Sequence, residues 1–186
     1  NEDLFECVGF IDYNKTEEEF PCPIIGHEDN MAGLVDEYEF SNCVLAIGDI
    51  KKRKEIHNKI EKFSLEFPPI IHSSVQCYSK DIQEGAIIYP GVVIMNDCRI
   101  GKFSFLNSGV SLGHDVVIGD FCNINPGVRF AGRITIDDGT FVGIGASFKE
   151  NISIGTNAII GAGSVVIHDV SDNTTVYGVP AKAAKS

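Results

Sequence analysis

Two adjacent titratable residues, His114 and Asp115, stand in a segment that is otherwise rich in Leu, Val, Ile, Gly and Asn. A histidine can accept a proton near neutral pH, and a neighbouring carboxylate can hold the ring and raise its basicity. The pair could therefore act as a general base. That chemistry requires an accessible imidazole, and the repeat around His114 predicts which way the ring points.

Large apolar residues recur at every sixth position over fifteen hexads, and a small or β-branched residue follows each of them four places later. The large residues are Ile82, Ile88, Ile94, Ile100, Leu106, Leu112, Ile118, Ile124, Phe130, Ile136, Val142, Phe148, Ile154, Ile160 and Val166. The small residues are Ala86, Val92, Cys98, Ser104, Val110, Val116, Cys122, Val128, Ile134, Thr140, Ala146, Ile152, Ala158, Ser164 and Val170. This period is typical of a hexapeptide parallel β-helix, in which three hexads close one triangular coil. We expect both repeat positions to face inward and the coils to stack at roughly 4.8 Å.

His114 is the third residue of its hexad. The same position elsewhere holds residues typical of corners, among them Pro90, Asn96, Lys102, Asp120, Pro126, Asp138 and Thr156. The phase of the repeat therefore predicts that His114 lies on the surface, although an incidental surface histidine stays an alternative on the repeat alone. Residues one coil apart stack, which places Asn96 below His114 and Gly132 above it. The missing side chain of Gly132 would leave a small cleft beside the imidazole.

The composition excludes several classes of protein. The 186 residues carry a net charge of −11, whereas binding to a phosphate backbone needs clustered Lys and Arg, so we expect no nucleic acid partner. No apolar run reaches the ~18 residues of a membrane span, and no leader typical of a signal peptide opens the chain. The six cysteines show no CxxC spacing, which argues against a zinc ribbon and predicts free thiols in a reducing cytoplasm.

The first part of the chain, residues 1–69, has a different pattern and predicts a small α/β domain ahead of the β-helix of residues 70–186. Apolar runs at 7–12 and 43–49 suit buried parallel strands, and 50–63 and 31–38 suit amphipathic helices. Ligands of such units bind beyond the carboxyl ends of the strands, which makes Asp12, Tyr13, Gly48 and Asp49 candidate site residues. Ordinary turns at the strand ends are an equally good interpretation of these residues.

Four features together resemble one family of bacterial sugar acyltransferases, the sialic acid O-acetyltransferase and UDP-4-amino-sugar N-acetyltransferase family. They are the hexads, the pair His114-Asp115 followed by Val117-Ile118-Gly119-Asp120, the step Ala131-Gly132, and the end Gly178-Val179-Pro180-Ala181-Lys182. The resemblance implies a Rossmann-like domain followed by a left-handed β-helix. It also implies a homotrimer that binds acetyl-CoA between neighbouring β-helices and transfers the acetyl group to a nucleotide-linked amino sugar in glycan biosynthesis.

The resemblance also implies roles for particular residues. His114 would be the general base, Asp115 its supporting acid, and Gly132 would offer its backbone N–H to the thioester oxygen. Four further residues would contact acetyl-CoA, namely Asn107, Asn123, Ile144 and Ala162. The nucleotide-sugar would contact Asp12, Tyr13 and Gly48.

This chain departs from the family's pattern in two places. The family usually begins with a strand and a glycine-rich loop that helps to hold the nucleotide, whereas this chain opens at what resembles the second strand. We therefore expect an N-terminally incomplete α/β domain. Many members also carry a second histidine nine residues after the first, and here that residue is Asn123, which cannot act as a base.

A β-helix of this kind is also compatible with three other functions. A β-helix carbonic anhydrase needs three histidines on one zinc, but His114 and His168 stand three coils apart, ~14 Å at the usual strand spacing, so we expect no metal. An O-acetyltransferase acting on sialic acid or another sugar stays an alternative. A β-helix without catalytic activity, acting as a scaffold, is the alternative from another class.

Overall fold

Two units of different architecture make up the chain, Asn1–Pro68 and Pro69–Ser186. The structure is a computed structural model that describes residues 5–12 and 22–184. None of the helices in this described part is long and apolar enough to cross a membrane. Because the arrangement of the two units is not determined, each is considered by itself.

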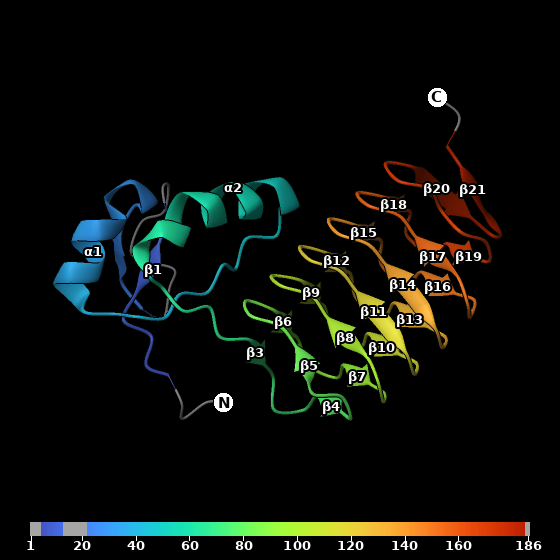
Figure 1. Cartoon of the computed structure of the whole chain (residues 1–186), viewed down its shortest axis with the longest axis horizontal. Coiled ribbons are helices and arrows are strands. Elements are labelled where there is room, and N and C mark those ends of the chain that lie inside the picture. Colours follow the sequence, from blue (N-terminus) through green and yellow to red (C-terminus); the bar gives the residue numbers. More distant parts are fainter. Residues whose placement is uncertain (1–4, 13–21, 185–186) are drawn as a thin grey trace. The chain divides into compact units, whose positions relative to one another are not determined.

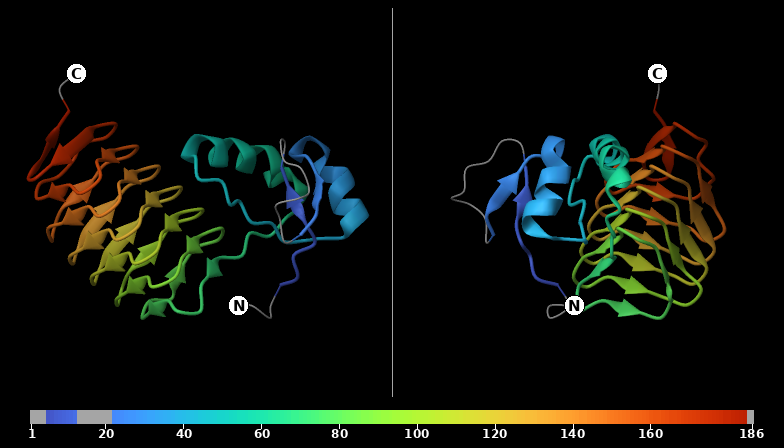
Figure 2. Two further views of the ribbon diagram at one scale, coloured as in Figure 1. Left: turned by 180° about the vertical axis from the view of Figure 1, so that it is seen from behind. Right: turned by 60° about the vertical axis from the view of Figure 1, so that its left-hand side comes forward.

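The second unit is a left-handed β-helix in which each hexad contributes one short strand, and the strands stack into three parallel sheets (Figures 1 and 2). Face 1 contains β4 (Gln76–Cys77), β7 (Val93–Ile94), β10 (Ser111–Leu112), β13 (Arg129–Phe130), β16 (Ser147–Phe148) and β19 (Val165–Val166). Face 2 contains β5 (Asp81–Ile82), β8 (Arg99–Ile100), β11 (Val116–Ile118), β14 (Ile134–Ile136) and β17 (Ser153–Ile154). Face 3 contains β3 (Ile70–Ile71), β6 (Ile87–Ile88), β9 (Phe105–Leu106), β12 (Asn123–Ile124), β15 (Phe141–Val142), β18 (Ile159–Ile160), β20 (Thr175–Gly178) and β21 (Ala181–Ala183). The last strand is antiparallel and closes the stack as a hairpin.

Strand pairing confirms the predicted coil of three hexads. Leu112 pairs with Ile94 on one side and with Phe130 on the other, each one coil away in sequence. The large repeat residues are buried from Ile88 onward, while Ile82 in the first coil is partly exposed. The small repeat residues are buried throughout. One apolar core therefore runs along the prism, as the alternation of large and small residues predicts.

The polar residues at the small position are buried without loss of hydrogen bonds. Ser104 Oγ donates to the carbonyl of Gly119 at 2.7 Å and accepts from the backbone N–H of Cys122 at 2.8 Å. Thr140 Oγ1 donates to the carbonyl of Gly155 at 2.9 Å. Because each hydroxyl has a backbone partner, these side chains cost little when they are buried.

Three corners join the faces. We name the corner between faces 1 and 2 the histidine corner (Asn96, His114, Gly132), that between faces 2 and 3 the aspartate corner (Lys102, Asp120, Asp138), and that between faces 3 and 1 the isoleucine corner (Pro126, Ile144, Ala162). At every corner from Gly85 to Gly163 the fourth residue of the hexad has a positive φ. Glycine, asparagine and aspartate adopt this left-handed conformation most readily.

Carboxylates connect neighbouring coils at the aspartate corner. Asp120 Oδ1 accepts from the backbone N–H of Lys102 at 2.8 Å, and Asp138 Oδ1 accepts from that of Asp120 at 2.7 Å. A Cβ on Gly119 would stand 2.5 Å from Asp138 Oδ1, so the glycine leaves the space that this carboxylate occupies. At this corner, the glycine that follows the large repeat residue makes room for the aspartate of the next coil, as Gly119 does for Asp138.

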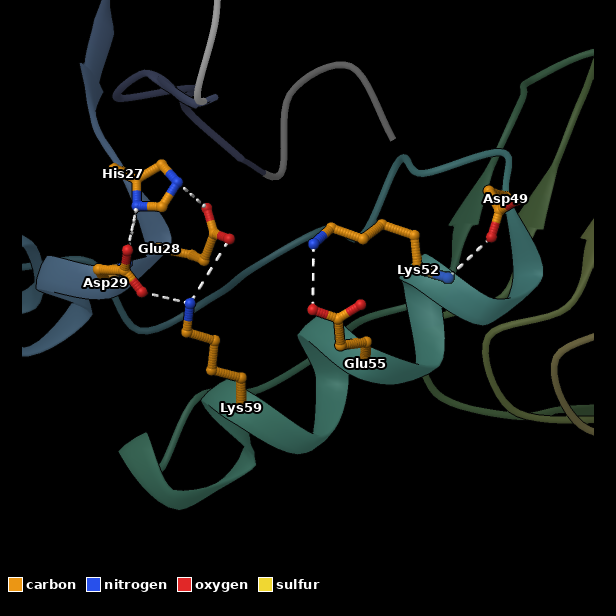
Figure 3. Close-up of polar contacts among 7 residues, drawn as sticks. All are labelled: His27, Glu28, Asp29, Asp49, Lys52, Glu55 and Lys59. Carbon is orange, nitrogen blue, oxygen red and sulfur yellow. Dashed lines mark hydrogen bonds and ion pairs between the residues drawn. The ribbon is translucent and has the colours of Figure 1, made fainter.

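The first unit contains a two-stranded parallel sheet of β1 (Phe10–Ile11) and β2 (Ile24–Gly26), with helices α1 (Met31–Tyr38) and α2 (Ile50–Ile60). Short 3₁₀ turns at Glu28–Asn30 and Glu61–Phe63 precede α1 and follow α2. Both helices lie where their apolar spacing predicts them. Asp49 caps α2 by accepting from the backbone N–H of Lys52 at 2.8 Å (Figure 3).

The predicted buried strand at 43–49 is wrong. Within the described residues this run has no strand neighbour, and only Asn42 forms an isolated bridge, to Glu66. Leu45 is buried, but the neighbouring Val44 is 45% exposed, so one side of the run is covered and the other is open. An apolar run forms a strand that is buried on both sides only where neighbouring strands pair with it in a sheet.

Candidate functional site

His114 lies on the histidine corner, after β10 and Gly113, with its side chain 54% exposed. This confirms the direction that the phase of the repeat predicts. Its Nδ1 lies 2.6 Å from Asp115 Oδ2. Asp115 is the fourth residue of the hexad, with φ +57°, and this left-handed turn places its carboxylate beside the preceding ring. An Nδ1 that donates to Asp115 leaves Nε2 as the proton-accepting nitrogen.

The imidazole packs on Gly132 of the next coil. Arg133 N donates to the carbonyl of His114 at 2.9 Å, and Asp115 N donates to that of Asn96 at 3.1 Å, so the predicted stack of Asn96, His114 and Gly132 is confirmed. A Cβ on Gly132 would stand 2.5 Å from His114 Nε2. The glycine therefore provides the space that the ring occupies, and its Cα lies next to the basic nitrogen.

The backbone N–H of Gly132 has no acceptor within the described part of the chain. The aspartate corner differs, because there the backbone N–H groups of Lys102 and Asp120 each donate to a carboxylate of the next coil. The histidine corner thus combines an accessible imidazole with an available N–H donor. A base beside such a donor is the arrangement that acyl transfer requires.

Two of the predicted cofactor residues lie at the isoleucine corner. Ile144 is 57% exposed, Ala162 is also exposed, and the two are stacked through the bond from Gly163 N to the carbonyl of Ile144, 2.8 Å. Together they form an exposed apolar edge that extends over two neighbouring coils. This edge and the histidine corner are separated by the whole of face 1, so one chain does not bring His114 and Ile144 together.

Asn107 and Asn123 lie near the isoleucine corner, and both are engaged with the coil. Asn107 Nδ2 donates to the carbonyl of Ile124 at 3.3 Å, and Asn125, which the sequence reasoning missed, repeats this bond to Val142 at 2.8 Å. Asn107 and Asn125 stand one coil apart in the sequence, and this spacing could have predicted that the two side chains make equivalent bonds. Asn123, on β12, is 7% exposed, and its N–H donates to Thr140 O at 3.0 Å.

The predicted substrate residues belong to the first unit. Asp12 is exposed at the carboxyl end of β1, and its N–H donates to the carbonyl of Gly26 at 3.1 Å. Gly48 is exposed just before α2, and among the described residues a Cβ there would meet nothing within 4 Å. Tyr13 lies outside the described residues. The Asp49 carboxylate is used as a helix cap.

A second polar cluster in the first unit connects α2 to the turn before α1 (Figure 3). Lys59 on α2 is paired with Asp29, and its Nζ lies 3.5 Å from Glu28 Oε1. The pairing raises the pKa of Lys59 and lowers that of Asp29. His27 lies between the two carboxylates, 2.9 Å from Glu28 and 3.0 Å from Asp29. These partly exposed ion pairs connect α2 to the turn before α1, which is a structural role.

Neither buried cysteine of the β-helix is suited to nucleophilic catalysis. Cys98 and Cys122 are free thiols at the small repeat position, and burial raises the pKa of both, that of Cys122 to about 12. A thiol is nucleophilic only as the thiolate, so these groups are inert packing residues. Within the described residues there is also no cluster of His, Cys, Asp or Glu that could hold a metal ion.

Comparisons with known proteins agree with both units. Residues 97–132 and 133–168 match the family model described as bacterial transferase hexapeptide (six repeats), and residues 1–60 match the PglD N-terminal domain. A comparison with curated protein sequences found no significant match.

Several solved structures are similar to the chain over most of its length. A histidine-to-asparagine variant of perosamine N-acetyltransferase from Caulobacter crescentus, in complex with CoA and GDP-perosamine, is 29% identical with a TM-score of 0.89 over 96% of this chain and 85% of that one. PerB from the same organism, with the same two ligands, is 30% identical with a TM-score of 0.83 over 91% and 82%. The acetyltransferase domain of PglB from Neisseria gonorrhoeae, in complex with acetyl coenzyme A, is 25% identical with a TM-score of 0.80 over 95% and 85%.

A left-handed β-helix that carries an exposed histidine–aspartate pair and follows a Rossmann-like domain defines the class of hexapeptide-repeat acyltransferases. Within that class the chain belongs to the sugar acetyltransferase family that includes PerB.

Proposed function

We propose that the chain transfers an acetyl group from acetyl-CoA to an amino group of a nucleotide-linked sugar. The observation that carries the proposal is the His114–Asp115 pair packed on Gly132, with Nε2 accessible beside an unpartnered N–H. The similar proteins support the choice of reaction, because they were crystallised with CoA or acetyl-CoA and, for the two Caulobacter structures, with GDP-perosamine. Glycan biosynthesis is the role that such a product would serve.

The reaction is direct acyl transfer. The sugar amine attacks the thioester carbonyl and forms the C–N bond while His114 Nε2 takes the amine proton. The tetrahedral intermediate then collapses, the C–S bond breaks, and CoA leaves as the thiolate, which can take the proton from the imidazolium. Asp115 acts on Nδ1, where its carboxylate holds the ring and stabilises the imidazolium. A positioned base of this kind contributes roughly 10²–10⁴-fold in rate.

Gly132 supplies the electrostatic part of the mechanism. The carbonyl oxygen becomes negative in the intermediate, and the available N–H of Gly132 can donate to it. A donor of this type contributes roughly 3 kcal/mol to the stabilisation of the transition state. The same residue thus makes space for the base and binds the oxyanion.

We place the cofactor channel between two copies of the chain in a homotrimer. His114 and the apolar edge of Ile144 and Ala162 lie on different corners, so a channel that uses both requires a second copy to present its isoleucine corner to the histidine corner. Asn107 and Asn123 lie near that second edge and would contact the pantetheine arm. Each trimer would then contain three equivalent sites.

The nucleotide would be bound by the first unit. Asp12 is exposed at the carboxyl end of β1, Gly48 is exposed just before α2, and Tyr13 would complete the set. A carboxylate such as that of Asp12 can accept from a ribose hydroxyl or a base N–H, and the open space at Gly48 lets the backbone approach a ligand.

A thiol-release assay tests the proposal. Acetyl-CoA is supplied with a panel of UDP-, GDP- and CMP-linked amino sugars and with free sialic acid, for the wild type and His114→Ala. We expect release with a nucleotide-linked amino sugar and a loss of about 10²-fold or more in the variant. Release with sialic acid alone would assign O-acetylation instead. No release with any acceptor, together with no binding of acetyl-CoA, would favour the scaffold alternative.

A further inference from the structure

Three basic side chains that lie on or near the histidine corner form no ion pair with a carboxylate of the described residues. Arg129, Arg133 and Lys149 are exposed, and none of them forms an ion pair within residues 5–12 and 22–184. Other cations of the β-helix do, since Lys102 is 2.7 Å from Glu84 and Arg99 is 3.9 Å from Asp81. The same corner also carries the exposed carboxylates of Asp115 and Glu150, neither of which is paired with these cations, so the three basic groups stay available to an anionic ligand.

The three cations lie within two coils of His114. Arg129 is the outward residue of β13 on face 1, three residues before Gly132. Arg133 directly follows Gly132, and Lys149 stands one coil above Ala131, since Ala131 N donates to the carbonyl of the neighbouring Phe148. The cations therefore lie on the strand that leads into the histidine corner, on the corner itself and on the next coil.

Arg133 occupies a position that is unfavourable for an arginine. It is the fourth residue of its hexad, with φ +58°, where the other described corners have glycine, asparagine, aspartate or phenylalanine. Its Nε donates to Asn151 Oδ1 of the next coil at 2.6 Å. That bond fixes the guanidinium and leaves its two terminal nitrogens available as donors. The other corners of the coil share this conformation, including those at Phe103 and Phe121, so what distinguishes Arg133 is a guanidinium held in place at the histidine corner.

We propose that Arg133, with Lys149 and Arg129, binds the diphosphate of the nucleotide-sugar while its amino group meets His114. This inference rests on the proposed function and specifies its substrate class. Only a sugar ring separates the reacting amine from the sugar-linked phosphate, whereas the long pantetheine arm separates the thioester from the phosphates of CoA. The anion nearest the base is therefore that of the sugar. Several cations suit a diphosphate better than the single phosphate of a CMP-sugar.

The test is the variant Arg133→Asn, because asparagine is accommodated in the same conformation at Asn151 and Asn157. We expect KM for a UDP- or GDP-linked amino sugar to rise about tenfold or more, as the loss of a charged hydrogen bond would cause. KM for acetyl-CoA should not change, and neither should kcat/KM for the same amino sugar without its nucleotide. Arg99→Asn, on face 2, is the matched control and should behave as the wild type.

Three results would overturn the proposal. They are an unchanged KM for the nucleotide-sugar, a rise in KM for acetyl-CoA alone, and loss of the oligomer in light scattering, which would identify the cations as contacts between copies. Calorimetry with inorganic pyrophosphate separates this inference from the proposed function. If the wild type acetylates none of the sugars, pyrophosphate binding that is weakened in Arg133→Asn still supports the anion site, and equal binding refutes it.

Discussion

The reactivity of His114 depends on two neighbours that act on opposite sides of one ring. Asp115 engages Nδ1 at 2.6 Å, and Gly132 lies against the ring edge that carries Nε2. Neither contact is made by a buried group, so the site is held by backbone geometry rather than by core packing. Small changes at position 132 should therefore act on catalysis more than on folding.

Gly132→Ala tests this dependence. The added Cβ would stand 2.5 Å from Nε2 and 2.7 Å from Cε1 of His114, so the imidazole must rotate away. Position 132 does not require a positive φ, and alanine should fold normally there. We expect kcat to fall by about 10²-fold, comparable to loss of a positioned base, with acetyl-CoA affinity much less affected. Steady-state kinetics and calorimetry measure the two effects.

The double variant Gly132→Ala with His114→Ala is the control for that experiment. If the clash with the imidazole is the whole effect, the double variant is no slower than His114→Ala alone, and the two substitutions are strongly non-additive. Additive losses would contradict the steric account and would place the effect of Gly132→Ala on the oxyanion N–H instead.

Only part of the site around His114 can be predicted from the sequence. The phase of the hexads is enough to place His114 outward and Gly132 above it. The Nδ1–Asp115 bond depends on the left-handed turn at Asp115. The residue one coil after Gly132 is Glu150, whose carboxylate does not accept the Gly132 N–H as the aspartates of the aspartate corner accept theirs. Arg133 was missed because a basic residue has no signature in a hexad until its corner conformation is known.

At the scale of elements, the carboxylates of the aspartate corner should stabilise the stack without affecting catalysis. Asp138→Ala removes the acceptor of the Asp120 N–H at an exposed site, which should cost about 1 kcal/mol. For a chain of this size that corresponds to a fall of about 2–4 °C in Tm. The neighbouring Asp137→Ala is the control, because Asp137 is exposed and its hydrogen bonds within the described residues use only its backbone groups. Equal Tm values for the two variants would contradict this role.

The inward position of the hexads predicts how the thiols react. Burial raises the pKa of Cys122 from 9.0 to about 12, so at pH 8 the folded chain should not be labelled there by a thiol reagent, nor at Cys98. The exposed Cys7 and Cys77 should react quickly, and all six cysteines should react in denaturant. Labelling of native Cys122 at the rate of a free thiol would contradict its burial.

The raised pKa of Cys122 also makes the stability of the folded chain depend on pH. Because the folded pKa of Cys122 lies above the unfolded value of 9.0, the native state retains this proton more tightly than the unfolded chain. The stabilising contribution is fully present below pH 9 and is lost as pH rises toward about 12. We expect Cys122→Ala to show a shallower fall of stability over this range, as measured by denaturant unfolding at several pH values.

The elements differ in how far their sequence predicts them. The β-helix is predicted almost completely, since each hexad has its own inward residues and the same neighbours above and below. The helices α1 and α2 are predicted by their apolar spacing. The run at 43–49 was not, because a strand exists only where another strand pairs with it, and the amino acids of the run itself do not supply that information.

At the scale of the whole molecule, the separation of His114 from Ile144 leads to a prediction about assembly. Light scattering should give three times the chain mass of 20.2 kDa. His114→Ala removes the base, and Ile144→Asp places a charge on the apolar edge at a position that is 57% exposed and outside the core. We expect each variant to be inactive and trimeric when it is prepared alone.

Mixing the two variants distinguishes a shared site from a site within one chain. If each site combines the histidine corner of one copy with the isoleucine corner of the next, random hybrid trimers contain some sites with neither substitution. Equal mixing should then restore about a quarter of wild-type activity. A site contained in one chain would be damaged in every copy of the mixture, so hybrids without activity would refute the shared channel. The experiment therefore tests whether the active site forms between copies of the chain, since a single β-helix holds His114 and Ile144 on different corners.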